Sequence, residues 1–580
     1  MTAFRVWAPA AGQIEVEVEG RRYGMQVETD GWRFAEVSEA GAGGSYRYVV
    51  DGDPLPDPRS ASQPQGVHGP SQLVDHSSFA WGDQDWRGID LRAAIIYELH
   101  VGTFTREGTF DAVVAKLDHF LELGVNAIEL MPVAEFSGDR GWGYDGVDLF
   151  APHHAYGGPE GLKRLVDACH QRGLAVIMDV VYNHLGPTGN YLGRYGPYFT
   201  DRYATPWGQA VNYDGADSKP VRDFVCDNAL MWLRDYHCDG LRLDAVHAIF
   251  DMSALHILEE LGLRVEAMAG ELGRSVFVIA ESDVNDPRLV RAREAGGYGM
   301  DAQWSDDFHH ALHAVLTGER SGYYADFGAV ADIAYALKHA YVYDGRFSRY
   351  RRRVHGRPAS GLPGSRFLGY LQNHDQVGNR ARGERSSALM STGKLKVGAG
   401  LVLTSPFIPM LFQGEEWGAA TPFCYFTDHR EPELARAVSQ GRIREFEDFG
   451  WRREDIPDPQ RRETFEASRL DWAELEREPH ASLLRWHREL IALRKRLPAL
   501  GDGSLEAVRT CFSDEGRWLV VERGPVTIAA NLGEAPACLT MASGRPRQVL
   551  LASEPSVRDE GGVLELPTET IAILGPAGGS

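Results

Sequence analysis

The sequence has few cysteines, and none of them belongs to a recognisable ligand set. Six cysteines are spread over 580 residues, with no C-x-x-C pair and no histidines at zinc-ligand spacing. This pattern argues against a zinc site and against a disulfide framework. The N-terminus has no basic head followed by an apolar run, and no apolar stretch approaches the ~18 residues that span a bilayer. We therefore expect a protein of the reducing cytoplasm with no membrane partner.

Positive charge is also in the minority. Sixty Lys and Arg stand against 82 Asp and Glu, which gives a net charge of −22 at pH 7. Such a surface repels phosphate backbones, so nucleic acid is not an expected partner. The densest basic run, 349–353, is interpreted as a solvated loop. Because 43% of the residues are hydrophobic, wholesale disorder is excluded, and the length calls for about two to four domains.

Both ends of the chain have the pattern of small β-domains. Short alternating runs within 4–50, separated by glycine-rich turns, indicate an antiparallel β-sandwich. A stretch rich in Pro, Ser, Gly and Asp at 51–70 marks a boundary, so we assign 1–90 to an immunoglobulin-like, carbohydrate-binding type of sandwich with its linker. Short strands return near the other end, and 501–580 is predicted to be a second β-sandwich.

Residues 91–500 alternate apolar strands with helices, which requires parallel strands buried on both faces. Eight such strands close a barrel. The predicted fold class is therefore α/β, a (β/α)8 TIM barrel flanked by the two sandwiches. The strands are expected at 94–99, 125–131, 174–181, 240–246, 276–281, 301–304, 367–371 and 409–412, and three of the helices at 110–123, 161–172 and 482–497.

Polar residues follow four of these apolar strands. In a parallel barrel, functional groups lie at the carboxyl ends of the strands, so these four ends are the first candidates for a site. Arg242 and Asp244 are two residues apart, so both are expected to face the barrel axis while Leu241 and Leu243 face the helices. The polar ends comprise Asp179, Asn183 and His184; Arg242, Asp244 and His247; Glu281 and Asp283; and Gln372, Asn373, His374 and Asp375.

The acids at these ends suggest acid–base chemistry. A guanidinium next to a buried carboxylate keeps it ionised, so Arg242 is expected to maintain Asp244 as a nucleophile. Glu281 ends an apolar strand near another acid, and both conditions raise the pKa of a carboxyl toward that of a general acid. One ionised and one protonated carboxyl are what the cleavage of a glycosidic bond requires. Taken singly, each acid could instead cap a helix or pair with a cation.

Histidines and aromatic residues extend the candidate site. His184 and His374 could be core residues, but we assign them to hydrogen bonds with sugar hydroxyls, because no H-x-H or H-E-x-x-H spacing supports metal ligation. Flat aromatic rings stack on pyranose faces, so a set of them suggests several sugar subsites. The aromatic residues expected in loops after strands are Trp142, Tyr144, Trp207, Trp304, Trp417 and the group 423–426, which includes Tyr425.

The four polar strand ends resemble, in chain order, the four signature segments of the α-amylase family of glycoside hydrolases. This resemblance implies that Asp244 is the nucleophile, Glu281 the acid/base and Asp375 the stabiliser of the transition state. Asp179 becomes a structural acid behind them. Substrate contacts are expected from Tyr144, His184, Arg242, His247, His374, Trp417 and Tyr425.

Further stretches resemble one branch of that family over nearly the whole chain, notably 97–105, 182–191, 414–429 and 464–472. The resemblance implies retaining hydrolysis of the α-1,4 bond next to the terminal trehalose unit of a maltooligosyl trehalose or related α-glucan. Trehalose and a maltooligosaccharide would be released. Candidates for the trehalose side are Trp207, Asp283, Asn285, Asp286 and Gln376.

Two alternatives and one metal question accompany this interpretation. The chain could be a glycogen branching or debranching enzyme of the same family, or a non-catalytic glucan-binding protein, because a fold alone does not determine function. The short segment 185–219 replaces a longer metal-binding excursion found in many α-amylases. We therefore expect no cofactor and no obligatory calcium, although Asn183 stands where those relatives bind calcium.

Overall fold

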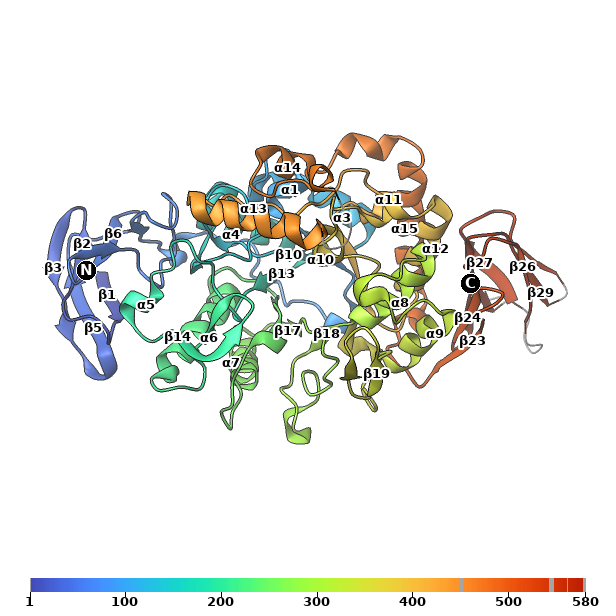
Figure 1. Ribbon diagram of the computed structural model, residues 1–580, viewed down its shortest axis with the longest axis horizontal. Coiled ribbons are helices and arrows are strands. Elements are labelled where there is room, and N and C mark those ends of the chain that lie inside the picture. Colours follow the sequence, from blue (N-terminus) through green and yellow to red (C-terminus); the bar gives the residue numbers. More distant parts are fainter. Residues whose placement is uncertain (1, 448–451, 542–546, 561, 577–580) are drawn as a thin grey trace.

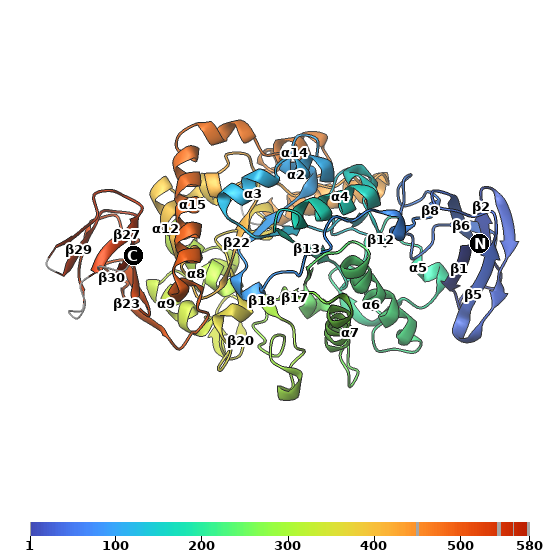
Figure 2. The ribbon, with the colours of Figure 1, turned by 180° about the vertical axis from the view of Figure 1, so that it is seen from behind.

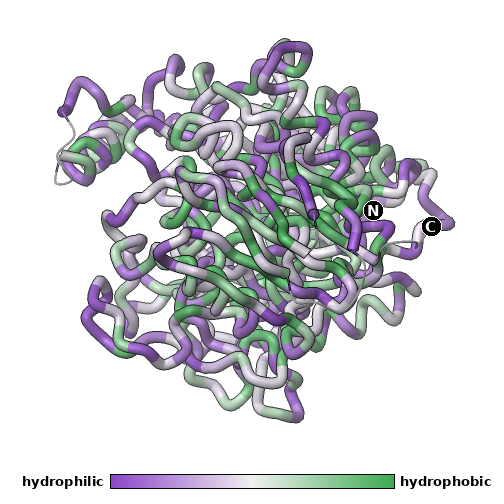
Figure 3. The backbone as a smooth tube through the Cα atoms, turned by 90° about the vertical axis from the view of Figure 1, so that its right-hand side faces the viewer, coloured by the Kyte–Doolittle hydropathy of each residue, from purple (hydrophilic) through white to green (hydrophobic). Residues whose placement is uncertain are grey.

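The computed structural model describes residues 2–447, 452–541, 547–560 and 562–576. Figure 1 shows the N-terminal sheets (blue) and the C-terminal sheets (red) at opposite ends of a central barrel with its helices. Hydrophobic segments run mostly through the interior and hydrophilic segments through the outer loops (Figure 3). No helix of the described residues is long and apolar enough to cross a membrane.

The N-terminal part consists of two antiparallel sheets that pack face to face. In β2 (Ile14–Val18), every second residue is buried, as the alternating sequence predicts. The rings of Phe4 and Tyr46, one from each sheet, lie 5.1 Å apart and join the two layers. One sheet contains β1 (Thr2–Trp7), β5 (Trp32–Val37) and β4 (Gln26–Val27); the other contains β3 (Arg21–Gly24), β2, β6 (Ser45–Val50), β7 (Asp53–Leu55) and β8 (Ser71–Gln72).

The central part is a closed barrel of eight parallel strands, as predicted. Each strand pairs with the next one along the chain, and the last pairs with the first. The strands are β9 (Ile96–Leu99), β10 (Ala127–Leu130), β13 (Ala175–Val180), β16 (Gly240–Leu243), β17 (Phe277–Ala280), β18 (Ala302–Trp304), β21 (Phe367–Gly369) and β22 (Ile408–Phe412).

Alternation along the strands separates the barrel interior from the layer beneath the helices. Leu241 and Leu243 pack in the outer apolar layer, whereas Arg242 between them lies over the ring of Trp304 inside the barrel, 4.3 Å from its centroid. Asp179 stands beside Arg242 in the register of β13 and β16. The period of two thus directs the charged side chains toward the axis, as the sequence predicts.

Helices surround the barrel, and one of them differs from its prediction. The expected helix at 110–123 is two helices, α2 (Phe110–Val114) and α3 (Leu117–Leu123), because Lys116 between them has non-helical φ/ψ angles of −110° and 5°. The other helices are α1 (Val101–Phe104), α4 (Gly158–His170), α5 (Leu192–Tyr195), α6 (Ser218–Arg234), α7 (Ile257–Leu272), α8 (Asp306–Thr317), α9 (Val330–His339), α10 (His374–Gly378), α11 (Ser386–Leu389), α12 (Thr392–Leu403), α13 (Pro432–Glu447), α14 (Arg462–Ala467), α15 (His480–Arg496) and α16 (Pro498–Gly501).

Three two-stranded sheets project from the loops of the barrel. They are β11 (Ala134–Glu135) with β12 (Asp148–Pro152), β14 (Phe199–Thr205) with β15 (Gly208–Val211), and β19 (Arg346–Ser348) with β20 (Arg353–His355). The second lies within the short segment 185–219, and the third contains the basic run 349–353.

The C-terminal part again has two antiparallel sheets, and Figure 2 shows α15 running beside them along the barrel. Leu539, Leu564 and Leu566 of the smaller sheet pack with Ala572 and Leu574 of the larger one, which makes a sandwich as predicted. The larger sheet contains β23 (Val508–Ser513), β24 (Trp518–Arg523), β25 (Val526–Asn531), β30 (Thr570–Pro576) and β27 (Arg547–Ala552); the smaller contains β26 (Ala537–Thr540), β29 (Val563–Leu566) and β28 (Arg558–Glu560).

Candidate active site

One buried guanidinium brings together acids from three neighbouring barrel strands. Arg242 has no exposed surface. Its Nη1 donates to Oδ2 of Asp179 at 2.7 Å and to Oδ1 of Asp244 at 3.0 Å. Its Nη2 lies 3.5 Å from Oε2 of Glu281. Three acids that are far apart along the chain, Asp179, Asp244 and Glu281, therefore share a single cation at the carboxyl end of the barrel.

The carboxylate of Asp244 is held on both of its oxygens. Arg242 binds Oδ1, and the side-chain amide of Asn183 donates to Oδ2 at 2.7 Å. The same amide also donates to the backbone oxygen of Asp244 at 2.8 Å. Asn183, which the sequence left as a potential calcium position, thus has its amide nitrogen directed at Asp244. These contacts fix the orientation of the carboxylate.

Glu281 has the environment of a proton donor. Its Oε2 accepts a hydrogen bond from the backbone N–H of Ala245. Burial raises the pKa of Glu281 well above its usual value, and the negative charges of Asp244 and Asp375 raise it further, against the opposing effect of Arg242. This upward shift of the pKa of Glu281 is in the direction that a general acid needs.

His374 is a buried cation. Its Nδ1 lies 2.5 Å from Oε1 of Glu98, and its backbone N–H donates to the other oxygen of Glu98 at 3.0 Å. Burial alone would lower the pKa of His374, but the charges of Glu98 and Asp375 raise it to about 9. Asp375 lies 3.6 Å from Nε2 of this imidazolium and keeps 39% of its side chain exposed. Asp375 is thus more exposed to solvent than Asp179, Asp244 and Glu281.

Tyr144 links these charges from the loop between β11 and β12. Its hydroxyl donates to Oδ2 of Asp179 at 2.7 Å and accepts from Arg242 at 3.3 Å. It lies 2.8 Å from Nε2 of His374, and the two rings stack with their centroids 5.2 Å apart. Tyr144 and His374, separated by more than 200 residues, form one wall beside the acids.

The sequence analysis missed three acids of this pocket among the described residues: Glu98 and Glu129, which are fully buried, and Asp306, which is half-buried. Asp306 opens α8 directly after β18 and accepts the hydroxyl hydrogen of Tyr370. Burial and neighbouring negative charges raise the pKa of Asp306 to about 7. Glu98 is the last residue but one of a predicted strand, and Glu129 lies within another. Burial and the charge of Glu98 raise the pKa of Glu129 well above its usual value. The rule that polar residues at strand ends face the site would have found Asp306 and Glu98.

The hairpin of β14 and β15 reaches over the end of the third barrel strand. Trp207 at its turn is 48% exposed and stacks on His184, with ring centroids 4.3 Å apart and planes at 6°. Burial lowers the pKa of His184, so the imidazole is neutral at pH 7. The pair offers a flat, accessible surface of the kind that binds sugar rings.

A second charged group follows the fifth barrel strand. Asp283 accepts from Nη1 of Arg351 at 2.9 Å, and Nε2 of His247 lies 3.9 Å from its other oxygen. Despite partial burial, the charges of His247 and Arg351 lower the pKa of Asp283. Arg351 belongs to the basic run 349–353, which is interpreted as a solvated loop: its other four residues are exposed, whereas Arg351 is half-buried against Asp283.

Some predicted contacts are used by the fold itself. Trp417 is fully buried and donates from Nε1 to Glu474 at 3.1 Å, so it cannot stack on a sugar. Trp304 is also buried, in strand β18. The expectation of a loop position is wrong for Trp304, which ends strand β18. Trp417 does follow β22, but its ring packs against His119 and Trp472 instead of lining a subsite.

The remaining candidates lie near the rim. Asn285 is buried, and its amide donates to Oδ2 of Asp307 at 2.9 Å and to the backbone oxygen of Tyr343 at 3.1 Å, which holds the loop rather than facing a ligand. Asp286 pairs with Arg288. The other two are Gln376, half-buried in the first turn of α10, and Tyr425, whose ring packs edge-on against Trp142 at 5.2 Å.

The barrel and its paired acids define a glycoside hydrolase of the alpha-amylase family. Residues 72–199 match the family model described as alpha amylase, catalytic domain, and residues 504–573 match a domain of unknown function. A Salmonella typhimurium structure described as an alpha amylase superimposes with a TM-score of 0.91 at 38% identity, over 99% of this chain and 97% of that one.

Two curated relatives show to which branch of this family the chain belongs. A malto-oligosyltrehalose trehalohydrolase of Mycobacterium tuberculosis is 48% identical over 581 residues, 99% of each chain. Another from Arthrobacter ramosus is 52% identical over 540 residues, 92% of this chain and 93% of the relative. The chain belongs to the malto-oligosyltrehalose trehalohydrolases.

Proposed function

We propose that Asp244 and Glu281 carry out the hydrolysis of the α-1,4 bond next to the terminal trehalose unit of a maltooligosyl trehalose. The observation that supports this most strongly is the shared guanidinium of Arg242, which places both carboxyls at one point. Retaining glycosidases need two carboxyl groups about 5–5.5 Å apart on either side of the scissile bond.

The reaction proceeds in two steps. Glu281 donates its proton to the glycosidic oxygen as Asp244 attacks the anomeric carbon, so that the C–O bond to trehalose breaks and a glycosyl ester forms. Water then attacks the same carbon, gives its proton to the Glu281 carboxylate and releases Asp244. The maltooligosaccharide leaves with its original α configuration.

The electrostatics assign the two roles. Asp244 receives hydrogen bonds on both oxygens from Arg242 and Asn183, which hold its carboxylate in one orientation for attack. Glu281 stands farther from the guanidinium and has a raised pKa. Asp375, the exposed acid, is free to bind sugar hydroxyls and to stabilise positive charge that develops on the ring.

Recognition of trehalose is assigned to the two accessible groups at the rim. Trp207 offers a flat face, and Asp283 with Arg351 and His247 offers hydrogen-bond donors and acceptors to a bent disaccharide. The buried contacts of Asn285 and the pairing of Asp286 with Arg288 favour a structural role for both residues.

The test compares two isosteric variants. Asp244→Asn is expected to reduce the rate of trehalose release from maltotriosyl trehalose by several orders of magnitude with the fold intact. Asp251→Asn is the matched control, because Asp251 is also buried and bonds to an arginine, Nη1 of Arg222, at 2.7 Å outside the pocket. If Asp244→Asn retains most of its activity, the assignment of the nucleophile fails.

Product analysis tests the substrate and the stereochemistry. Chromatography should show trehalose and maltotriose from maltotriosyl trehalose, and much slower cleavage of maltopentaose. Transfer products or linear chains from starch would instead favour a branching or debranching enzyme. A β-configured reducing end in the first NMR spectra of the product would exclude the two-step mechanism.

A further inference from the structure

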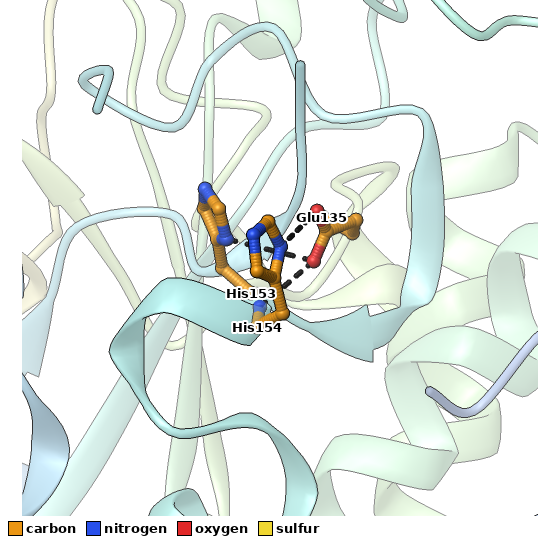
Figure 4. Close-up of side chains that lie close together, drawn as sticks. All are labelled: Glu135, His153 and His154. Atoms are coloured by element: carbon orange, nitrogen blue, oxygen red, sulfur yellow. Dashed lines mark hydrogen bonds and ion pairs between the residues drawn. The ribbon is translucent and has the colours of Figure 1, made fainter. Parts of the chain in front are cut away.

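Three side chains that have no place in the hydrolysis converge at the base of the Tyr144 loop (Figure 4). Glu135 ends β11, and His153 and His154 follow β12, so they come from both ends of the loop 136–147. Nδ1 of His154 lies 2.7 Å from Oε1 of Glu135, and Nδ1 of His153 lies 3.5 Å from Oε2. One potential ligand atom from each residue falls within 4.8 Å of the others.

The hydrogen bonding of His153 is poor for a fully buried side chain. Its Nε2 has no partner among the described residues. Its Nδ1 accepts a long hydrogen bond of 3.3 Å from the backbone N–H of Ala155 and approaches Glu135 at 3.5 Å. Buried polar groups are almost always hydrogen-bonded at shorter distances than these.

The separation of 3.5 Å between Nδ1 of His153 and Oε2 of Glu135 fits a shared metal ion better than a hydrogen bond. Two ligand atoms on a tetrahedral ion with bonds of about 2.0–2.1 Å lie about 3.4 Å apart. A small movement of His154 away from Glu135 would complete a set of three ligands. His154 is 26% exposed on its side chain, which leaves a path for an ion and a solvent-facing fourth position.

The surroundings of the cluster also suit a cation. Glu135 is fully buried, and a divalent ion next to a buried carboxylate would offset the cost of burying its charge. On the far side of His154, Nε2 lies 3.5 Å from Oδ1 of Asp139. A carboxylate next to the outer nitrogen of a ligating histidine is a regular feature of metal sites, because it orients the ring.

We propose that Glu135, His153 and His154 form a binding site for a divalent transition metal of the zinc type. Two imidazoles and one carboxylate select Zn²⁺ over Ca²⁺ and Mg²⁺, which prefer oxygen ligands. The bound ion joins the two ends of the loop 136–147. It therefore stabilises the loop that carries Tyr144 to Asp179 and Trp142 to the backbone oxygen of Cys424.

A purely structural ion pair between Glu135 and His154 is the competing explanation. That pair, with the backbone N–H of His154 that donates to Oε2 at 2.8 Å, accounts for both oxygens of Glu135, but it does not account for the 3.5 Å approach of Nδ1 of His153. The two explanations differ in what happens when metal is added, because the ion pair alone gives no saturable binding.

The experiment uses the full chain after dialysis against a chelator. Calorimetric titration with ZnCl₂ should show one saturable site per chain, and Zn²⁺ should raise the Tm because it binds the folded state. Co²⁺ should bind at the same site with the visible absorption of a tetrahedral ion. CaCl₂ and MgCl₂ should neither compete nor raise the Tm.

Variants locate the site. His154→Asn changes a partly exposed residue. It should weaken Zn²⁺ binding by well over about tenfold, because even the loss of a residue that only hydrogen-bonds to a metal ligand costs about tenfold in affinity. Glu135→Gln is the second variant, and His339→Asn in α9, outside this cluster, is the matched control. Absence of saturable binding, unchanged affinity in both cluster variants, or saturation of the site by Ca²⁺ would each overturn the proposal.

Discussion

The hydroxyl of Tyr144 gives the sharpest test of how the pocket is held together. Tyr144→Phe keeps the ring that stacks on His374 and removes only the oxygen. Asp179 then retains Arg242 as a partner at 2.7 Å, whereas the Nε2–H of His374 loses its acceptor at 2.8 Å. The substitution therefore leaves a buried imidazolium with an unpaired donor next to the acids.

The size of the effect follows from these contacts. Hydrogen bonds to charged groups contribute about 1.5–3 kcal/mol each, and removing one partner costs the other its desolvation. The hydroxyl contacts three charged groups, but Asp179 and Arg242 keep their direct bond to each other. We therefore expect a loss of about 2–3 kcal/mol in transition-state stabilisation, or about 30- to 160-fold in kcat/KM.

The assay is the initial rate of trehalose release from maltotriosyl trehalose, with thermal melting measured in parallel. Tyr195→Phe is the control: Tyr195 is more deeply buried than Tyr144, and its hydroxyl donates to the backbone oxygen of Pro56 at 2.7 Å, away from the acids. Tyr195→Phe should lower the Tm and leave kcat/KM unchanged. If Tyr144→Phe stays within about threefold of the wild-type kcat/KM, the hydroxyl does not organise the pocket.

Three further outcomes are expected. Asp306→Asn removes a charge that raises the pKa of Glu281, so the alkaline limb of the kcat/KM profile should move to lower pH. An unmoved limb would show that the charge of Asp306 does not influence the pKa of the catalytic acid. Glu98→Gln removes the main charge that, against burial, raises the pKa of His374 from 6.5 to about 9. The stability that this raised pKa contributes is present below pH 6.5 and is lost as the pH rises through about 9. Between these pH values the Tm of the variant should therefore fall less than the Tm of the wild type. Parallel curves of Tm against pH for the two proteins would contradict the reasoning. Trp207→Ala should raise KM for maltotriosyl trehalose. It should leave the Tm unchanged, because the exposed ring contributes little to packing. An unchanged KM would show that Trp207 does not contact the substrate.

The barrel could be predicted because its strands are apolar on both faces and their spacing is regular. Even β18, with only three residues, was found, since seven clearer strands left one position unfilled. The alternation of Arg242 with Leu241 and Leu243 then predicted which side chains reach the axis, and the structure confirms the inward arginine. Local pattern was sufficient where the geometry of a strand alone decides the direction of a side chain.

The course of loops could not be predicted in the same way. Hydrophobic spacing at 110–123 fits one helix face and does not reveal that Lys116 interrupts it. The burial of Trp417 depends on how its loop packs against Glu474, 57 residues further along. The charge of His374 depends on Glu98, 276 residues away in the sequence. Each of these features arises from tertiary contacts that a single sequence does not display.

The raised pKa of Glu281 follows from the charge balance of the whole pocket. Among the described residues around Arg242 and His374, buried carboxyls outnumber these two cations, and burial penalises every charge, so the pKa values of several acids rise. Arg242 bonds to Asp179 and Asp244 but stands 3.5 Å from Glu281, so its cation opposes this rise least closely at Glu281. Each neutralising substitution among neighbouring acids should then lower the pKa of those whose pKa is raised. These acids are Glu129, Asp179, Glu281 and Asp306.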